Sequence, residues 1–99
     1  MEGKRILDFG SRNAMTANHY AKNNEVFAIE PDENIITQRF NENNYVQLCG
    51  SLDKLYEFED NYFDVIFCHN VLEYADKREE IVKNLNCIKY VCMQITIII

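Results

Sequence analysis

The stretch ILDFGSRNAMTANHY, residues 6–20, is the part of the sequence from which the fold can be argued. Its first residues are apolar apart from Asp8, and they predict a buried strand that ends at Gly10. A helix is expected directly afterwards. A strand, a glycine and a helix in that order are typical of loops that bind a nucleotide cofactor. In this stretch Arg12 and Ala14 stand where such loops usually carry further glycines.

Composition sets the broad class of the protein. The chain has 99 residues, of which 47% are apolar and 26% are charged, and its formal net charge is −6. These values predict one globular domain over residues 1–99. Net negative charge disfavours loose attraction to nucleic acid or to an anionic membrane surface, so neither DNA nor a membrane is an expected partner. Five acidic residues fall in one short region, which we interpret as a solvated face and loop: Asp53, Glu57, Glu59, Asp60 and Asp64.

The cysteines and the chain ends bear on location. Cys49, Cys68, Cys87 and Cys92 lie among apolar neighbours and form no CxxC pair. We interpret them as small buried thiols in a reducing cytosol, with metal binding and disulfides as the alternatives, and we predict no metal site. The first residues lack the apolar run of a signal peptide, and the final ITIII is too short to span a bilayer. A cytoplasmic location is therefore expected.

Strand-type and helix-type segments alternate along the chain. Strands are predicted at RILDF, EVFAIE, YVQLC and YFDVIFC, and a fifth within YVCMQITIII. The first helix has Ala14, Ala17 and Ala21 on one face, where small side chains let a helix lie close to a sheet. Asn23 and Asn24 offer a left-handed stop for that helix.

Three further helices are expected between the later strands. The second lies within PDENIITQRF, with Pro31 in its first turn and Phe40 stacked on Ile36 one turn earlier. A short third helix follows Ser51 as its cap, and a fourth begins at the capping-box stretch DKRE, residues 76–79. This alternation predicts parallel strands joined by right-handed crossovers, which is an α/β, doubly wound sheet of the Rossmann-like kind.

In such a sheet, ligands bind outside the carboxyl ends of the strands, and several polar loops are expected to meet there. The P-loop pattern GxxxxGK[ST] does not occur, because the one Gly-Lys pair, Gly3-Lys4, stands at the start of the chain and is followed by Arg5. A dinucleotide is disfavoured because Arg12 would obstruct the close approach of a pyrophosphate. The candidate site residues at this edge are Asp8, Gly10, Ser11, Arg12, Glu30, Pro31, Gly50, Ser51, Leu52, Cys68, His69 and Asn70.

A third kind of nucleotide loop fits better. The stretch resembles motif I of class I S-adenosylmethionine-dependent methyltransferases, an acidic residue followed by Gly-x-Gly-x-Gly, here Asp8, Gly10, Arg12 and Ala14. AIEPDENII is similar to the family's second strand, whose terminal acid, here Glu30, binds the ribose hydroxyls. GSLDKLYEFEDNYFDVIFCHNVLEYA is similar to the family's stretch from the adenine-binding loop through strand four. The resemblance implies S-adenosyl-L-methionine as cofactor, methyl transfer as the reaction, and strand order 3-2-1-4-5.

The resemblance also implies individual roles. Asp8 would serve the ammonium group of the cofactor, directly or through water, and the backbone amides after Gly10 would suit its carboxylate. Ser51 stands near the place of the acid that holds the adenine amine in many members. His69 and Asn70 are the expected wall facing the transferred methyl group, with a base needed only when the acceptor loses a proton.

Two departures from the family's motif carry further expectations. Arg12 either swings outward or fills part of the methionine pocket, where it would pair with Asp8 or bind the cofactor carboxylate. We expect it to lower cofactor affinity, and Arg12→Gly to restore it. Judged on the residues alone, Asp8 could instead be a loop cap and Glu30 a solvated strand end.

The family's segments before strand one and after strand five have no counterpart here, so a truncated chain that lacks the family's final strands is expected. Strand five would then be an edge, and QITIII predicts a homo-oligomer through it or a poorly soluble chain. The alternative is a truncated fragment that does not fold stably. The methyl acceptor is left open between a small molecule and RNA. The alternatives to a methyltransferase are an inactive cofactor-binding module and a remnant that binds no ligand and acts through protein association.

Overall fold

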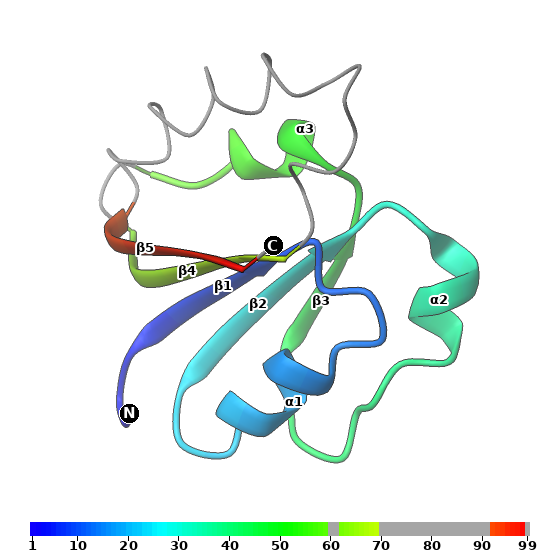
Figure 1. Cartoon of the computed structure of the whole chain (residues 1–99), viewed down its shortest axis with the longest axis horizontal. Coiled ribbons are helices and arrows are strands. Elements are labelled where there is room, and N and C mark those ends of the chain that lie inside the picture. Colours follow the sequence, from blue (N-terminus) through cyan, green and yellow to red (C-terminus); the bar gives the residue numbers. More distant parts are fainter. Residues whose placement is uncertain (60–61, 70–91, 99) are drawn as a thin grey trace.

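A computed structural model describes residues 1–59, 62–69 and 92–98 (Figure 1). Its strands are β1 (Arg5–Phe9), β2 (Glu25–Glu30), β3 (Val46–Cys49), β4 (Phe63–His69) and β5 (Cys92–Ile98). The helices among these residues are α1 (Met15–Tyr20), α2 (Glu33–Thr37) and α3 (Leu52–Leu55). The predicted fourth helix, from residue 76 onward, lies outside the described residues.

The five described strands form one parallel sheet in the order β3-β2-β1-β4-β5. β1 lies in the middle, with Asp8 paired to Ala28 of β2 on one side and to Phe67 of β4 on the other. From β1, the strands β2 and β3 extend the sheet in one direction, whereas β4 and β5 extend it in the other. This order confirms the predicted doubly wound α/β sheet and places its switch point at the carboxyl end of β1.

Each face of the sheet carries its own apolar layer. Figure 1 shows α1 and α3 on opposite sides of the strands. The residues of the layer beneath α1 are Ile6, Ala14, Ala17, Val26, Ala28, Val65 and Phe67. Those of the layer beneath α3 are Leu7, Phe9, Ile29, Leu55, Phe63, Ile66 and Cys68. Alternate residues of β1 thus enter opposite layers, as the period of a strand requires.

The alanine face of α1 packs on the sheet as predicted. Ala17 is fully buried and Ala21 is half-buried in the same layer. The predicted left-handed stop is wrong, because neither Asn23 nor Asn24 has a positive φ. The side chain of Asn24 closes the helix instead, since its Nδ2 donates to the carbonyl of Tyr20 at 3.0 Å.

The second helix is shorter than predicted. Asp32 is its cap, and its carboxylate accepts hydrogen bonds from two amides of the first turn. Pro31 therefore precedes the helix rather than standing in its first turn. The helix ends before Phe40, which is exposed and does not stack on Ile36 as a helical neighbour.

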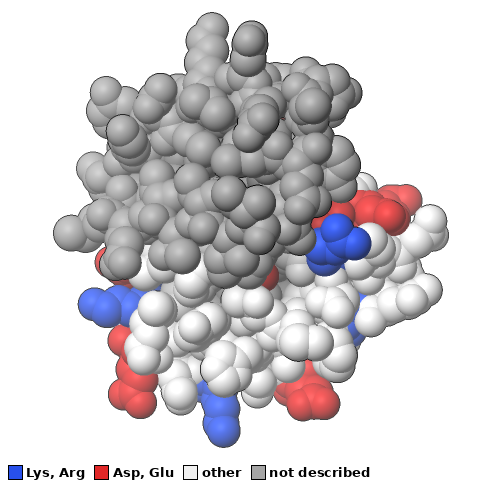
Figure 2. Space-filling view, viewed as in Figure 1, with Lys and Arg blue, Asp and Glu red and all other residues white. Residues whose placement is uncertain are grey.

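The acidic region is only in part a solvated face. Asp64 is half-buried, and its carboxylate accepts a hydrogen bond from the amide of Arg5 at 2.9 Å, which ties the start of β1 to β4. Asp60 lies outside the described residues. The other members are exposed: Asp53, Glu57 and Glu59. Figure 2 shows acidic and basic side chains interspersed over the described part of one face.

The structure also bears on the expected buried thiols, on membrane-spanning helices and on the edge strand. Cys68 is buried as predicted, whereas Cys49 is exposed, so the buried-thiol interpretation is wrong for Cys49. Cys87 lies outside the described residues. In the part of the chain that the structure describes, every helix is too short or too polar to cross a bilayer. β5 is the outermost described strand next to β4, and association through its edge stays a prediction.

We expect Ala17→Leu to lower the free energy of unfolding by about 1–3 kcal/mol, because the larger side chain overfills the layer between α1 and the sheet. Denaturant unfolding followed by circular dichroism measures this change. Met15→Leu, at an exposed position of the same helix, is the matched control and should change it by less than about 0.5 kcal/mol. Equal effects at the two positions would contradict the close packing of α1.

Candidate functional site

The loop between β1 and α1 has the backbone of a glycine loop although it contains a single glycine. Gly10 has φ 80°, Arg12 has φ 51° and Ala14 has φ 61°. Residues with a Cβ adopt this left-handed region at a cost of about 1 kcal/mol each. Among the described residues other than glycine, only Arg12 and Ala14 do so. The positions that motif I fills with glycine are therefore the positions where the backbone favours glycine.

Glu30, at the end of β2, holds this loop from the neighbouring strand. Its Oε1 accepts a hydrogen bond from the amide of Arg12 at 2.8 Å, and its Oε2 accepts one from the amide of Asp32 at 3.0 Å. Glu30 is only 6% exposed, so the alternative interpretation of this residue as a solvated strand end is wrong. One buried carboxylate thus joins the loop after β1 to the loop after β2. We call this arrangement the Glu30 clip.

The other amides of the loop are also used within the protein. The amides of Gly10 and Ser11 both donate to the carbonyl of Ile29, at 2.8 and 3.0 Å, and the amide of Ala14 donates to the carbonyl of Ser11 at 2.8 Å. The backbone donors expected to receive the cofactor carboxylate are therefore mostly occupied. Arg12 is exposed at this loop and is the cationic side chain within it.

Asp8 lies below the loop and has no exposed surface. Its neighbours across the sheet, Ala28 and Phe67, belong to the layer beneath α1, and paired residues of parallel strands point to the same face. Direct contact between Asp8 and an ammonium group, one of the two expected routes, is therefore closed in this structure.

Tyr45, the residue that precedes β3, interacts with the charged side chains of Arg39 and Asp8. Burial raises the pKa of Tyr45, and the nearby negative charge of Asp8 adds to the rise. Arg39 opposes it through its positive charge and a hydrogen bond to the hydroxyl. That hydroxyl also donates to the carbonyl of Phe40, whose amide donates in turn to the carbonyl of Asn13 at 2.8 Å. The segment after α2 is thereby fixed against the candidate site.

The loop after β3 reaches the same edge. The amide of Gly50 donates to the carbonyl of Glu30 at 3.1 Å. Ser51 is exposed, and its amide donates at 2.8 Å to the carboxylate of Asp53, which lowers the pKa of that carboxyl. Leu52 begins α3. Pro31, directly after Glu30, is exposed beside this loop.

The end of β4 lies next to the end of β1, since Cys68 pairs with Phe9. Cys68 is 3% exposed and belongs to the apolar layer beneath α3. His69 is the last residue of β4 and pairs with Ile98. The expected roles of His69 and Asn70 beside the transferred methyl group stay predictions. Asn70 lies outside the described residues. The four predicted loops nevertheless begin at one edge of the sheet (Figure 1).

Gln47 is a polar residue near the site that the sequence patterns did not single out. It pairs with Ala28 and so lies in the same row across the sheet as Asp8. Its Nε2 donates to the carbonyl of Leu48 at 3.1 Å and lies 3.5 Å from the hydroxyl of Ser11. A lone polar residue inside the apolar run YVQLC is the signal that could have identified it.

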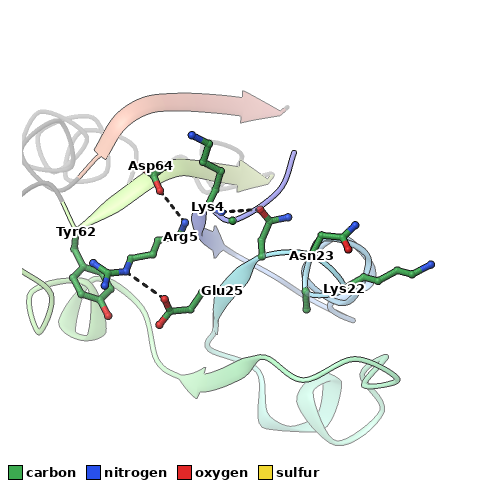
Figure 3. Close-up of a pocket in the computed structure, with 10 residues that line it drawn as sticks. Lys4, Arg5, Lys22, Asn23, Glu25, Tyr62 and Asp64 are labelled. Carbon is green, nitrogen blue, oxygen red and sulfur yellow. Dashed lines mark hydrogen bonds and ion pairs between the residues drawn. The ribbon is translucent and has the colours of Figure 1, made fainter.

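A shallow depression of about 770 Å³ lies at the opposite edge, near the amino ends of β1, β2 and β4 (Figure 3). The guanidinium of Arg5 lies there, 3.3 Å from the carboxylate of Glu25 and 4.5 Å from the ring centre of Tyr62. Cofactors of doubly wound sheets bind at the carboxyl ends of the strands. The depression therefore does not belong to the candidate site.

We expect Glu30→Ala to lower the free energy of unfolding by about 2–4 kcal/mol, because two partly buried amides lose hydrogen bonds to a charged group. Chemical denaturation gives the value. Glu42→Ala removes an exposed carboxylate and serves as the control, with an expected change within about 0.5 kcal/mol. A loss at Glu30 no larger than that at Glu42 would refute the clip.

We expect the Tyr45 hydroxyl to ionise above the ordinary tyrosine pKa of about 10, with Arg39→Ala raising the pKa further and Asp8→Asn lowering it. The neutral hydroxyl stabilises the fold below that ordinary value, and its contribution is lost as pH rises through the raised pKa. Phenolate absorbance measures the titration, and Tyr45→Phe identifies the signal among the six tyrosines. A pKa that falls in Arg39→Ala would contradict the arrangement.

Comparison with known proteins gives the family. A family model described as a methyltransferase domain matches residues 7–88, whereas no curated protein matches the chain. The phosphoethanolamine N-methyltransferase 1 of Haemonchus contortus, in complex with phosphoethanolamine and S-adenosylhomocysteine, is similar with a TM-score of 0.74 and 18% identity, over 93% of this chain and 21% of that one. The plantazolicin methyltransferase BamL, in complex with a triazolic desmethylPZN analogue and S-adenosylhomocysteine, is similar with a TM-score of 0.66 and 19% identity, over 88% of this chain and 34% of that one.

The same fold also carries another reaction. The [4+2]-cyclase SpnF is similar with a TM-score of 0.71 and 18% identity, over 92% of this chain and 35% of that one. The chain thus spans between 21% and 35% of these three structures. At such identities the likeness shows the fold alone. The family model covers most of the sequence, and the chain belongs to the class I S-adenosylmethionine-dependent methyltransferase domain family.

Proposed function

We propose that the chain binds S-adenosyl-L-methionine over the loop after β1 and transfers its methyl group to an acceptor that is a small molecule or RNA. The observation that carries the proposal is the Glu30 clip. It places a buried carboxylate at the end of β2, 2.8 Å from the amide of a loop with the backbone of motif I.

The carboxylate of Glu30 retains capacity for a ribose. An ionised carboxylate has about four lone-pair sites, and each oxygen of Glu30 accepts one backbone amide. The two vicinal hydroxyls of an adenosine can donate to the sites that remain. Because the clip already fixes the carboxylate, little side-chain entropy is lost on binding, which favours affinity. The residues present therefore fit the ribose end of the cofactor.

The methionine end would meet different groups from those of a three-glycine loop. Most amides of the loop are occupied, so the guanidinium of Arg12 is the group that would hold the cofactor carboxylate. The loop after β3, with Gly50 and Ser51, would lie beside the adenine. His69 and Asn70, at and after the end of β4, would face the transferred methyl group.

The bound cofactor supplies the reactive methyl group, so the main task of the protein is positioning. The clip holds two of the loops that would position the cofactor in a fixed relation to each other. A base such as His69 is needed only if the acceptor loses a proton during attack. Family membership and the two similar methyltransferase structures that contain S-adenosylhomocysteine support this proposal.

Cofactor binding without turnover is a second candidate. The observation that favours it is Arg12, which puts a long charged side chain at the motif position where the family has a glycine. In that case the domain would bind the cofactor without catalysing methyl transfer and would act by associating with a protein partner.

Calorimetric titration of S-adenosylhomocysteine into the folded protein tests the proposal. We expect saturable binding at one site that is lost in Glu30→Ala and kept in Glu42→Ala, with circular dichroism showing that each variant is folded. Absence of binding to the folded natural sequence would overturn it. Transfer of a radiolabelled methyl group to RNA or small-molecule acceptors then separates the enzyme from the second candidate.

A further inference from the structure

We infer that the site recognises the nucleoside half of its cofactor and gains little from the amino-acid half, so that it accepts 5′-thioadenosines that lack the amino acid. This inference rests on the proposed function and names the class of ligand that the same site takes. The residues present fit the ribose of the cofactor, whereas they do not fit its ammonium group.

The ribose end has a buried anchor in the carboxylate of Glu30. Each of its oxygens accepts one backbone amide, at 2.8 and 3.0 Å, and the residue keeps 6% of its surface exposed. Hydrogen bonds to an ionised group are roughly twice as strong as those between neutral groups. A ribose hydroxyl that donates to this carboxylate therefore contributes a strong interaction.

The ammonium end lacks the anion expected for it, because Asp8 has no exposed surface. Asp8 pairs across the sheet with Ala28 and Phe67, which belong to the layer beneath α1, and it lies in the same row as Gln47. Tyr45 packs against the same layer, and its pKa is raised by burial and further by the charge of Asp8. Asp8 is thus part of the interior beneath α1 rather than of the surface that a ligand meets.

The carboxylate of the amino-acid half would meet a loop whose amides are already used. Between residues 10 and 15, all amides but one donate to acceptors within the protein, namely those of Gly10, Ser11, Arg12, Ala14 and Met15. A ligand carboxylate that took one of these donors would replace a hydrogen bond rather than add one, so its net gain is small. The remaining amide, that of Asn13, belongs to an exposed residue.

The side-chain charge of the loop changes this comparison little. Arg12 is exposed, and an exposed ion pair with the ligand carboxylate changes a dissociation constant by about fivefold at most. The loss of one hydroxyl that donates to a charged group costs about 10- to 100-fold. Affinity therefore depends on the nucleoside half more than on the amino-acid half.

The consequence is a site open to more ligands than the methyl donor and its demethylated product. An adenosine with a small uncharged 5′ group keeps the contacts of the nucleoside and loses only the weak contacts of the amino acid. Such a nucleoside would compete with the donor at concentrations similar to those of S-adenosylhomocysteine. It would block methyl transfer, because it carries no sulfonium from which a methyl group can be transferred.

Calorimetric titration of the natural sequence with two pairs of ligands tests the inference. S-adenosylhomocysteine and 5′-methylthioadenosine differ in the amino acid, whereas adenosine and 2′-deoxyadenosine differ in one ribose hydroxyl. We expect S-adenosylhomocysteine to bind less than about tenfold more tightly than 5′-methylthioadenosine. We expect 2′-deoxyadenosine to bind about 10- to 100-fold more weakly than adenosine.

A preference of about tenfold or more for S-adenosylhomocysteine over 5′-methylthioadenosine would overturn the inference and leave the proposed function intact. Equal affinity for adenosine and 2′-deoxyadenosine would also overturn it, because the ribose would then not be the anchor. Absence of binding of all four ligands to the folded natural sequence would overturn both the inference and the proposed function.

Asp8→Asn examines the ammonium end separately, since it keeps the shape of the side chain and removes its charge. We expect it to change the dissociation constants of S-adenosylhomocysteine and 5′-methylthioadenosine by the same factor. A loss of affinity confined to S-adenosylhomocysteine would mean that Asp8 holds the ammonium group and would contradict the inference. Circular dichroism shows whether the variant is folded, and the comparison of ligands on the natural sequence does not depend on it.

Discussion

One buried carboxylate, that of Glu30, is the constraint on which the candidate site depends. It receives the amide of Arg12 from one loop and the amide of Asp32 from the next, so the two loops are held in one arrangement. Hydrogen bonds from amides to an ionised carboxylate are among the stronger ones in proteins. Their strength offsets the left-handed backbone that Arg12 and Ala14 adopt at a cost of about 1 kcal/mol each.

The replacement of two glycines therefore leaves the backbone of the loop in place and alters what the loop presents to a ligand. Ala14 directs its methyl group into the layer beneath α1, where it is fully buried. Arg12 instead adds an exposed positive charge to the loop. The likeness of the fold to both methyltransferases and a cyclase indicates that the sheet alone does not determine the reaction. The side chains of the loops determine the chemistry.

The sequence predicted the sheet well because its central strands are apolar runs and α1 has an alanine face. It predicted the loops less well, since their partners are backbone groups that leave no signature in the residue types. The dual use of Glu30 depends on where the amides of Arg12 and Asp32 point, and the burial of Asp8 depends on the layer beneath α1. The left-handed stop expected at Asn23 and Asn24 failed because a side-chain hydrogen bond closes the helix instead.

Amide hydrogen exchange in the ligand-free protein tests the central claim most directly, because it reports on the two hydrogen bonds of Glu30 one at a time. The account predicts that the amides of Arg12 and Asp32 exchange much more slowly than unstructured peptide amides, and that both lose this protection in Glu30→Ala. Exchange of these two amides at the unprotected rate in the natural sequence would contradict it. The loop would then lack the fixed arrangement from which the cofactor site is argued.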